Sequence, residues 1–322
     1  MCGLIKTFIA MAAYRFTLQP YKGWKTRFDC PSCGARRRFT RYIDTETGNY
    51  LDERVGRCDR VDSCGYHYTP KQFFEDNPLL GQSIELYRQV DVSPKPHTPK
   101  PVSYIPEDIF RQSLRRYSEN HLVFYLTRRF GADVAQDLVS CYRIGTSSHW
   151  GGATVFWQVD VTGKVRTGKV MLYDPEKGKR IKEPFSHINW VHSVLQLSEF
   201  NLQQCLFGEH LLASEPTKTV AVVESEKTAL IASVYLPQFV WLASGGLYNL
   251  SVEKCQVLKG RNVVLFPDVN SLEKWREKAQ ELSAVASVMV SEMLERGATA
   301  ADRQQGIDLA DYLVRFDVDM FR

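Results

Sequence analysis

Two acidic residues in the last third of the chain each follow an apolar run of strand length. Glu224 comes directly after the β-branched run 219–223, and Asp268 follows the run 262–266. A helical pattern comes after each acid, and alternating strands and helices favour a parallel sheet whose ligands bind at the carboxyl ends of its strands. Two carboxylates at that edge repel each other unless a cation lies between them, and Mg²⁺ takes such hard oxygen ligands. The alternative is that both acids are ordinary solvated loop residues.

Four cysteines in the first quarter of the chain have the spacing of a metal site. Cys30 and Cys33 are separated by two residues, and Cys58 and Cys64 form a wider second pair. Four thiolates in two close pairs predict a tetrahedral structural zinc, with His67 as an alternative ligand and disulfides or free core thiols as the alternative interpretation. Zinc thiolates imply a reducing, cytoplasmic setting. The other cysteines are isolated and are interpreted as core or surface thiols: Cys2, Cys141, Cys205 and Cys255.

Positive charge gathers around the first pair of cysteines. The cations of this basic cluster are Lys22, Lys25, Arg27, Arg36, Arg37, Arg38 and Arg41. Trp24, Phe28 and Phe39 lie between them. Cations that neutralise phosphates, beside rings that stack on bases, predict contact with single-stranded nucleic acid. The alternative is a solvated face whose aromatic rings form the small core of a zinc ribbon.

Composition and charge limit what kind of protein this chain can be. The chain has 322 residues, 44% of them hydrophobic, and a net charge of +4, so we expect two or three domains and only local nucleic-acid contacts. No apolar run approaches the length of a membrane span. The mildly apolar start, 1–13, could be mistaken for a short signal peptide. Met11 could equally be the true start of the protein, and we expect a cytoplasmic protein.

The middle of the chain carries patterns that position these groups. Apolar residues recur at helical spacing over 107–142, and the runs 153–160 and 165–173 predict a hairpin rich in basic residues. We expect Lys169 to face a phosphate, with an ordinary exposed lysine as the alternative. His210 is either a metal or nucleotide ligand or, as we favour, a hydrogen-bonded core histidine.

A third strand is expected between the two that end in acids, at 240–243. The turn 244–246, Ser-Gly-Gly, follows it. Glycines permit the close approach of a phosphate group, although a simple tight turn explains them equally well.

Changes in composition along the chain predict four segments. A zinc-ribbon module occupies 14–91, and five prolines mark an extended linker at 92–106. A helical and β-hairpin part follows at 107–212, and an α/β domain with a parallel sheet and helices on both faces occupies 213–322.

Three motifs in the last segment resemble the Toprim domain, which primases, topoisomerases and some nucleases share. The segment 223–230, VESEKTAL, looks like the Toprim Glu-Gly motif. The segment 266–270, FPDVN, looks like the Asp-x-Asp motif, and 306–313, GIDLADYL, is similar to a segment near the end of primase cores. A zinc module ahead of such a domain resembles the layout of primases, in which the basic hairpin region lies beside the Toprim sheet.

The resemblance assigns roles and also shows departures. It implies that Glu224 acts near the reacting phosphate and that Asp268 with Asn270 holds magnesium or manganese. Ser225 stands in the usual glycine position, Thr228 replaces an acid, and Asn270 replaces the second aspartate. An amide brings no charge, so metal affinity depends on whether three nearby acids compensate: Glu226, Asp308 and Asp311.

The resemblance implies a primase-like nucleotidyltransferase that acts on single-stranded DNA with nucleoside triphosphates, in the replication or mobilisation of a mobile element. Catalysis would involve Glu224, Asp268 and Lys169. The alternative is a catalytically degenerate DNA-binding protein, and a Toprim nuclease is disfavoured by the zinc module. No helicase P-loop is present in the sequence, so unwinding would require a separate helicase or relaxase.

Overall fold

The computed structural model describes residues 15–21, 23–60, 64–78, 101–197 and 199–321. The chain divides into two compact units, Met1–Thr98 and Pro99–Arg322. The expected start 1–13 with Cys2, Lys22 of the basic cluster and most of the expected linker lie outside the described residues. No described helix is long and apolar enough to cross a membrane.

The first unit is built on a small antiparallel sheet in the order β1-β2-β3-β4. Its strands are β1 (Phe16–Leu18), β2 (Phe39–Asp44), β3 (Gly56–Cys58) and β4 (His67–Tyr68). Phe39 is fully buried and packs with Cys30 and Cys58. Helix α1 (Pro70–Asp76) begins at a capping box made by Thr69 and Gln72. A small core of one ring and metal-site cysteines is typical of a domain that needs a metal for stability.

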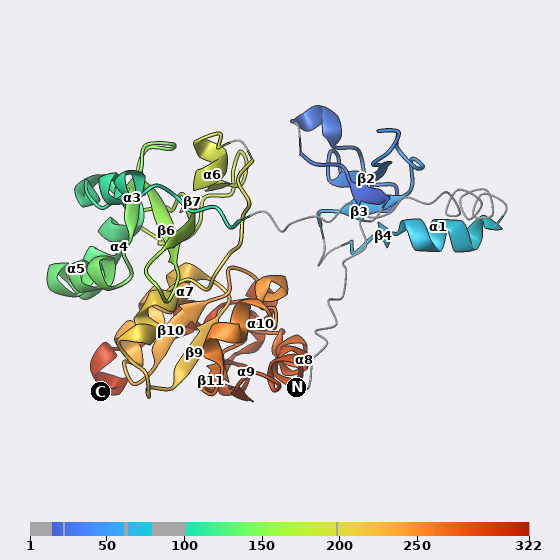
Figure 1. Ribbon diagram of the computed structural model, residues 1–322. Coiled ribbons are helices and arrows are strands. Elements are labelled where there is room, and N and C mark those ends of the chain that lie inside the picture. The colour runs from blue at the N-terminus through green and yellow to red at the C-terminus, as the bar shows by residue number, and fades with distance from the viewer. Residues whose placement is uncertain (1–14, 22, 61–63, 79–100, 198, 322) are drawn as a thin grey trace, which may run out of the picture. The chain divides into compact units, whose positions relative to one another are not determined.

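The first sheet of the second unit is antiparallel and has the order β5-β6-β7-β8. Figure 1 labels β6 and β7 of this sheet. Its strands are β5 (Gly145–Ser147), β6 (Ala153–Val159), β7 (Val165–Met171) and β8 (Ile188–Trp190). The expected hairpin is confirmed as β6 and β7, and β6 is buried along its whole length. The expected helices before the hairpin are also confirmed: α3 (Glu107–Ser113), α4 (His121–Phe130) and α5 (Ala132–Cys141).

A polar network fixes helix α4 onto this sheet. Asn120 is fully buried, and its Oδ1 accepts hydrogen bonds from the backbone N–H groups of Leu122 and Val123 and from the Thr154 hydroxyl of β6. Gly131, with φ of 90°, separates α4 from α5.

The second sheet of this unit has the order β10-β9-β11-β12, and all its pairings are parallel. Its strands are β9 (Val220–Val223), β10 (Val240–Ala243), β11 (Asn262–Leu265) and β12 (Ser287–Val290). The expected parallel arrangement of the first three strands is therefore confirmed. Strand β12 was not expected, because it is half exposed at the edge of the sheet and lacks a continuous apolar run.

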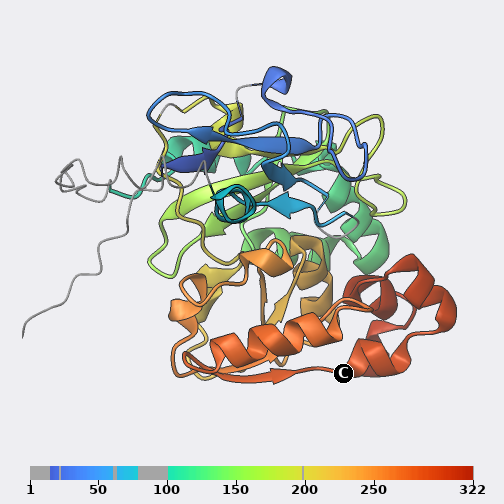
Figure 2. The same cartoon turned by 90° about the vertical axis from the view of Figure 1, so that its right-hand side faces the viewer.

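Helices cover both faces of the parallel sheet, as expected. Ala221 and Val223 point to one face and pack in the core that includes α7 (Glu226–Tyr235). Val220 and Val222 point to the other face, where they pack with Trp275 of α8 (Leu272–Leu282). Figure 2 shows α8, in orange, alongside this sheet. The remaining α-helices are α6 (Val191–Val194), α9 (Met293–Gly297), α10 (Ala300–Gln305) and α11 (Leu309–Leu313).

Candidate active site and metal centre

The parallel sheet brings Glu224 and Asp268 to the same edge. Strands β9 and β11 are neighbours in register, and the backbone N–H of Phe266 donates to the carbonyl of Val222 at 2.9 Å. Glu224 therefore leaves the end of β9 beside the point where Asp268 leaves the end of β11. Both carboxylates are partly buried. The edge of the sheet thus carries both acids at the ends of neighbouring strands.

The acids at this edge form an electrostatic cluster. Burial raises the pKa of Asp268 to about 8, and the negative charges of Asp308, Glu224 and Asp311 add to the effect, while Lys227 opposes it. We call Glu224, Asp268, Asp308 and Asp311 the acidic edge. A carboxylic acid that keeps its proton near neutral pH marks an excess of negative potential, which a bound cation would relieve.

Asp308 is held in place by residues that depart from the Toprim pattern. The Thr228 hydroxyl donates to Asp308 Oδ2 at 2.8 Å, and the Ser225 hydroxyl lies 2.8 Å from that of Thr228. The other Asp308 oxygen accepts the backbone N–H of Asp311 and so caps helix α11. The hydroxyl groups at the substituted positions therefore form a short chain that orients one carboxylate of the acidic edge.

A lysine that we did not single out from the sequence lies at the acidic edge. The ammonium group of Lys227 is 3.7 Å from Asp311 Oδ1, and the lysine is almost completely buried. The only signal in the sequence was its position in the first turn of the helix that follows Glu224.

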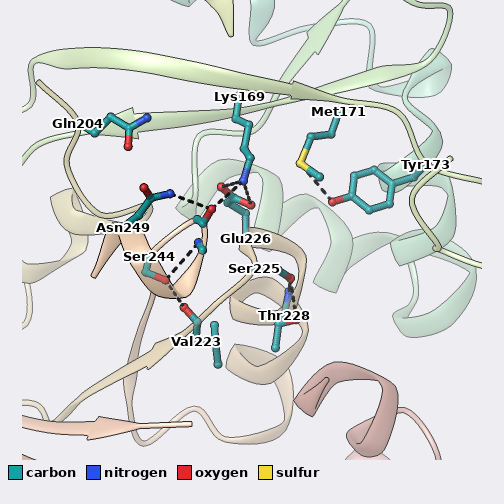
Figure 3. A network of polar contacts seen from close by, with 12 residues as sticks. Lys169, Met171, Tyr173, Gln204, Val223, Ser225, Glu226, Thr228, Ser244 and Asn249 are labelled. Atoms are coloured by element: carbon teal, nitrogen blue, oxygen red, sulfur yellow. Dashed lines mark hydrogen bonds and ion pairs between the residues drawn. The ribbon is translucent and has the colours of Figure 1, made fainter. Parts of the chain in front are cut away.

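A second charged pair lies next to the glycine turn that follows β10 (Figure 3). Lys169 Nζ contacts both carboxylate oxygens of Glu226, at 3.0 and 3.2 Å, and the carbonyl of Gly245 at 3.4 Å. The Glu226 side chain is 2% exposed and that of Lys169 11%. Because Lys169 belongs to β7 and Glu226 begins α7, this ion pair joins the antiparallel and parallel sheets.

Gly245 borders this pair so closely that no side chain fits easily. Its φ is +76°, and an added Cβ would lie 3.3 Å from Glu226 Oε1 and 3.6 Å from Lys169 Nζ. The Asn249 amide donates to the Gly245 carbonyl at 3.1 Å. The glycine turn is therefore required both by its backbone conformation and by the ion pair beside it.

Asn270 is an exposed residue with φ of 65° in the loop after β11. Its side-chain amide donates to the carbonyl of Arg303 at 2.8 Å, which anchors the loop after β11 to α10. The Nε2–H group of His210 donates to the carbonyl oxygen of Cys141 at 3.0 Å, and burial lowers the pKa of His210.

The oxygen donors of the acidic edge suit a divalent cation of the magnesium type. Such ions use one or two protein carboxylates, waters and substrate phosphates rather than a closed protein cage. Within the described ranges, the cysteine group is the only set of three or more potential ligands whose ligand atoms all lie within 4.8 Å of one another.

The four cysteines of the first unit converge as the sequence predicts. The Sγ atoms of Cys30 and Cys64 are 3.8 Å apart, and those of Cys33 and Cys58 lie in the same group. A tetrahedral zinc with bonds of about 2.3 Å holds its sulfurs about 3.8 Å apart, so the geometry fits zinc and not disulfides. His67 does not belong to the group and instead lies 2.9 Å from the Tyr42 hydroxyl.

The basic cluster near these cysteines divides into packed and exposed side chains. Arg27 stacks over Tyr21 and approaches Asp59 at 3.8 Å, and Arg41 packs 4.0 Å from the centre of the Phe28 ring. The cations with exposed side chains are Lys25, Arg36, Arg37 and Arg38.

One exposed cation of this cluster lies over an exposed ring. The Arg37 guanidinium is 3.8 Å from the centre of the Trp24 ring, and Trp24 is 63% exposed. Phe39, in contrast, is a core residue. The aromatic residues of the ribbon therefore divide between packing and surface display.

Comparison with known families matches two parts of the chain. Residues 14–79 match a family described as a zinc beta-ribbon finger, and this range contains all four cysteines. Residues 120–269 match a family described as a domain of unknown function (DUF6371). No curated protein matches the sequence. The first unit is therefore a zinc ribbon with a four-cysteine metal site.

Several solved structures resemble the chain. The primase fragment of the bacteriophage T7 primase-helicase protein is 14% identical, with a TM-score of 0.37, over 87% of this chain and 98% of that one. The zinc-binding and RNA polymerase domains of the Aquifex aeolicus primase are 13% identical, with a TM-score of 0.38, over 93% of this chain and 80% of that one. The RNA polymerase domain of the Mycobacterium tuberculosis primase DnaG is 13% identical, with a TM-score of 0.39, over 65% of this chain and 79% of that one.

Proposed function

We propose that the protein is a primase-like nucleotidyltransferase that joins nucleotides on a single-stranded DNA template, using a divalent cation at the acidic edge. The observation that carries the proposal is the pairing of β9 with β11, which brings Glu224 and Asp268 to the same edge of the sheet, with Asp308 and Asp311 at the start of α11 near enough to add to the raised pKa of Asp268. Such crowding costs folding free energy and is typical of sites that bind a cation.

The roles follow from chemistry and position. Glu224 and Asp268 would hold Mg²⁺ or Mn²⁺, with Asp308, Asp311 and the Asn270 carbonyl as further oxygen donors. The bound ion would supply positive charge for the phosphate oxygens during transfer. Thr228 orients Asp308, and Lys227 limits the repulsion among the acids.

Lys169 is proposed to contact a phosphate of the nucleotide. Its present partner is Glu226, so an incoming phosphate would compete with this carboxylate for the ammonium group. Glu226 would then be available as an additional metal ligand. Lys169 is thus proposed to act as a positioning residue that responds to nucleotide binding.

The zinc ribbon is proposed to hold the template strand. Cys30, Cys33, Cys58 and Cys64 would bind a structural zinc that orders the loops of the ribbon. Exposed cations would contact phosphates, and the Trp24 ring offers a stacking surface for a base. The setting proposed is replication or mobilisation of a mobile element, with a separate helicase or relaxase to open the duplex.

A primer-synthesis assay tests the enzyme proposal. Labelled nucleotides are incubated with mixed single-stranded templates, and Mg²⁺ is compared with Mn²⁺. We expect metal-dependent oligonucleotides from the wild-type protein and none from Glu224→Gln, with template binding retained by both. Glu277→Gln, on the exposed face of α8, serves as the matched control and should keep full activity.

A DNA-binding protein without efficient chemistry is the second candidate. It is favoured by the ion pair that occupies Glu226 and by the amide at position 270. If the wild-type protein binds single-stranded DNA but makes no oligonucleotide with either metal, this candidate replaces the first. Gain of synthesis in Asn270→Asp would then identify the missing charge as the cause.

A further inference from the structure

A cavity of about 390 Å³ lies in the second unit, outside the acidic edge. Its walls come from β7, from the segment 202–205 and from the two 3-10 turns Glu209–Ala213 and Lys254–Leu258. The volume falls in the range of small-molecule sites, which is about 300–1,000 Å³. Leu202 and Val257 contribute apolar surface, and the rest of the lining is mainly polar.

One wall of the cavity holds a lysine without a counter-ion. Lys254 Nζ donates to Gln204 Oε1 at 3.2 Å, and no carboxylate within the described residues lies in ion-pair distance of it. Burial lowers the pKa of Lys254, while Cys205, Cys255 and Glu226 oppose that shift. A cation that is partly removed from water and paired only with a neutral amide is stabilised by any anion that reaches it.

A second cation is fixed across from it. Arg166 Nε is 2.6 Å from Asp160 Oδ2, and its Nη1 donates to Gln203 Oε1 at 3.0 Å. The remaining terminal nitrogen, Nη2, has no hydrogen-bond partner in the part of the chain that the structure describes. Because the buried Asp160 holds the guanidinium in one orientation, this nitrogen is positioned without further loss of side-chain freedom.

The two glutamines supply further donors. Gln203 and Gln204 both use Oε1 to accept from a cation, and neither side-chain NH₂ donates to a residue within the described ranges. Consecutive glutamines whose oxygens are committed to cations present their amide hydrogens to a ligand instead.

Two acids line the cavity, the buried Glu209 and the exposed Glu253. Glu209 is buried, and its two oxygens accept the backbone N–H groups of Val161 at 3.2 Å and Leu206 at 3.1 Å. Burial raises the pKa of Glu209, and the two backbone hydrogen bonds oppose that shift. The Glu209 carboxyl group is therefore committed to the main chain, and the cavity wall keeps hydrogen-bond donors from Lys254, Arg166 and the two glutamines.

We propose that this cavity binds a small molecule through a phosphate group, which contacts Lys254, Arg166 and the two glutamine amides. The organic part of the ligand would lie against Leu202 and Val257. The site is separate from the acidic edge, and the inference does not rest on the proposed function. The ligand class is a nucleotide or another small phosphate ester of similar size.

Isothermal titration calorimetry of the full-length, zinc-loaded protein in buffer without added divalent cations tests the proposal. The probes are adenosine 5′-monophosphate, inorganic pyrophosphate and adenosine. We expect a phosphate-bearing probe to bind and adenosine not to bind. The first two probes distinguish a phosphate ester from a bare phosphate as the preferred ligand. Failure of both to bind at millimolar concentration would overturn the proposal.

Substitutions in the cavity wall test whether the phosphate-bearing probes bind there. Lys254→Met should weaken binding about ten-fold or more, because a hydrogen bond between charged groups is lost. Lys259→Met removes an exposed lysine just after the same 3-10 turn and should leave affinity unchanged.

Val257→Phe tests the location independently by filling the apolar wall, and it should abolish binding of adenosine 5′-monophosphate. If Lys254→Met binds as tightly as the wild type, the cavity is not the site. Loss of binding in Asp268→Asn with retention in Lys254→Met would place the ligand at the acidic edge and refute the proposal.

Discussion

Replacing Asp268 by asparagine should stabilise the protein in the absence of a divalent cation. The pKa of Asp268 is raised from 3.8 to about 8, first by burial and then by the neighbouring acids. An acid whose folded-state pKa is raised keeps its proton in the folded chain while the unfolded chain loses it. Stability therefore falls as the pH rises from about 4 to about 8 and then levels off. Asparagine has the same shape and carries no charge, so this loss is absent from the variant.

The magnitude follows from the interval between the two pKa values. A pH of 7 lies about three pH units above the pKa of Asp268 in the unfolded chain, and each unit lowers the stability of the wild type by about 1.36 kcal/mol. At pH 7 the wild type is therefore less stable than the variant by about 4 kcal/mol. At pH 5 the difference shrinks to between about 1 and 2 kcal/mol by the same relation. For a unit of this size, about 4 kcal/mol corresponds to a rise in Tm of roughly 8–16 °C.

Calorimetric melts at pH 5 and pH 7, with zinc retained, measure this effect. Asp137→Asn is the matched control, because Asp137 is exposed on α5, and its Tm should not change. Added Mg²⁺ should stabilise the wild type, more at pH 8 than at pH 6, and should not stabilise Asp268→Asn. The electrostatic account of the acidic edge would be refuted if Asp268→Asn had a lower Tm than the wild type at pH 7. It would also be refuted if the substitution raised Tm by the same amount at pH 5 and at pH 7.

Three further changes test other parts of the structure. Gly245→Ala should lower the free energy of unfolding by about 1–2 kcal/mol for the left-handed backbone, and by a further amount because the new Cβ crowds Glu226. Gly260 has the same φ of +76° but open space around it, so Gly260→Ala should show the backbone cost alone. Urea unfolding measures both variants. Thr228→Val should lower stability by about 1.5–3 kcal/mol, since a buried hydrogen bond to a carboxylate is lost, and Thr127→Val on α4 should be neutral in the same melts. Cys33→Ser should reduce bound zinc, measured by metal analysis, and unfold the ribbon by circular dichroism; a fully zinc-loaded, folded variant would contradict the four-cysteine site.

The sequence predicts the parallel sheet well because two of its strands are short, apolar and fully buried. Strands β9 and β10 are buried at every position, and such runs followed by helical patterns have few alternative folds. Strand β12 escapes prediction because exposed and partly exposed residues alternate along it at the edge of the sheet. Strand β5 is a three-residue Gly-Thr-Ser segment that only its pairing with β6 defines as a strand.

The candidate site shows where sequence reasoning ends. The juxtaposition of Glu224 and Asp268 follows from the order of strands and helices alone. The pairing of Lys169 with Glu226 does not, because these residues are 57 positions apart and lie on different layers of the fold. The bond from Thr228 to Asp308 spans 80 positions. Such contacts depend on how the two sheets and α11 pack, and no local pattern encodes that packing.

The bond between Lys169 and Glu226 couples two kinds of ligand. An anion that attracts Lys169 leaves an almost fully buried carboxylate without its counter-ion, which is costly until a cation replaces the ammonium group. A cation that reaches Glu226 in turn releases the lysine for an anion. Each ligand therefore lowers the free energy of binding the other by the same amount. Cation affinity measured with nucleotide present should exceed the affinity measured without it, and the same factor should appear when the order of addition is reversed.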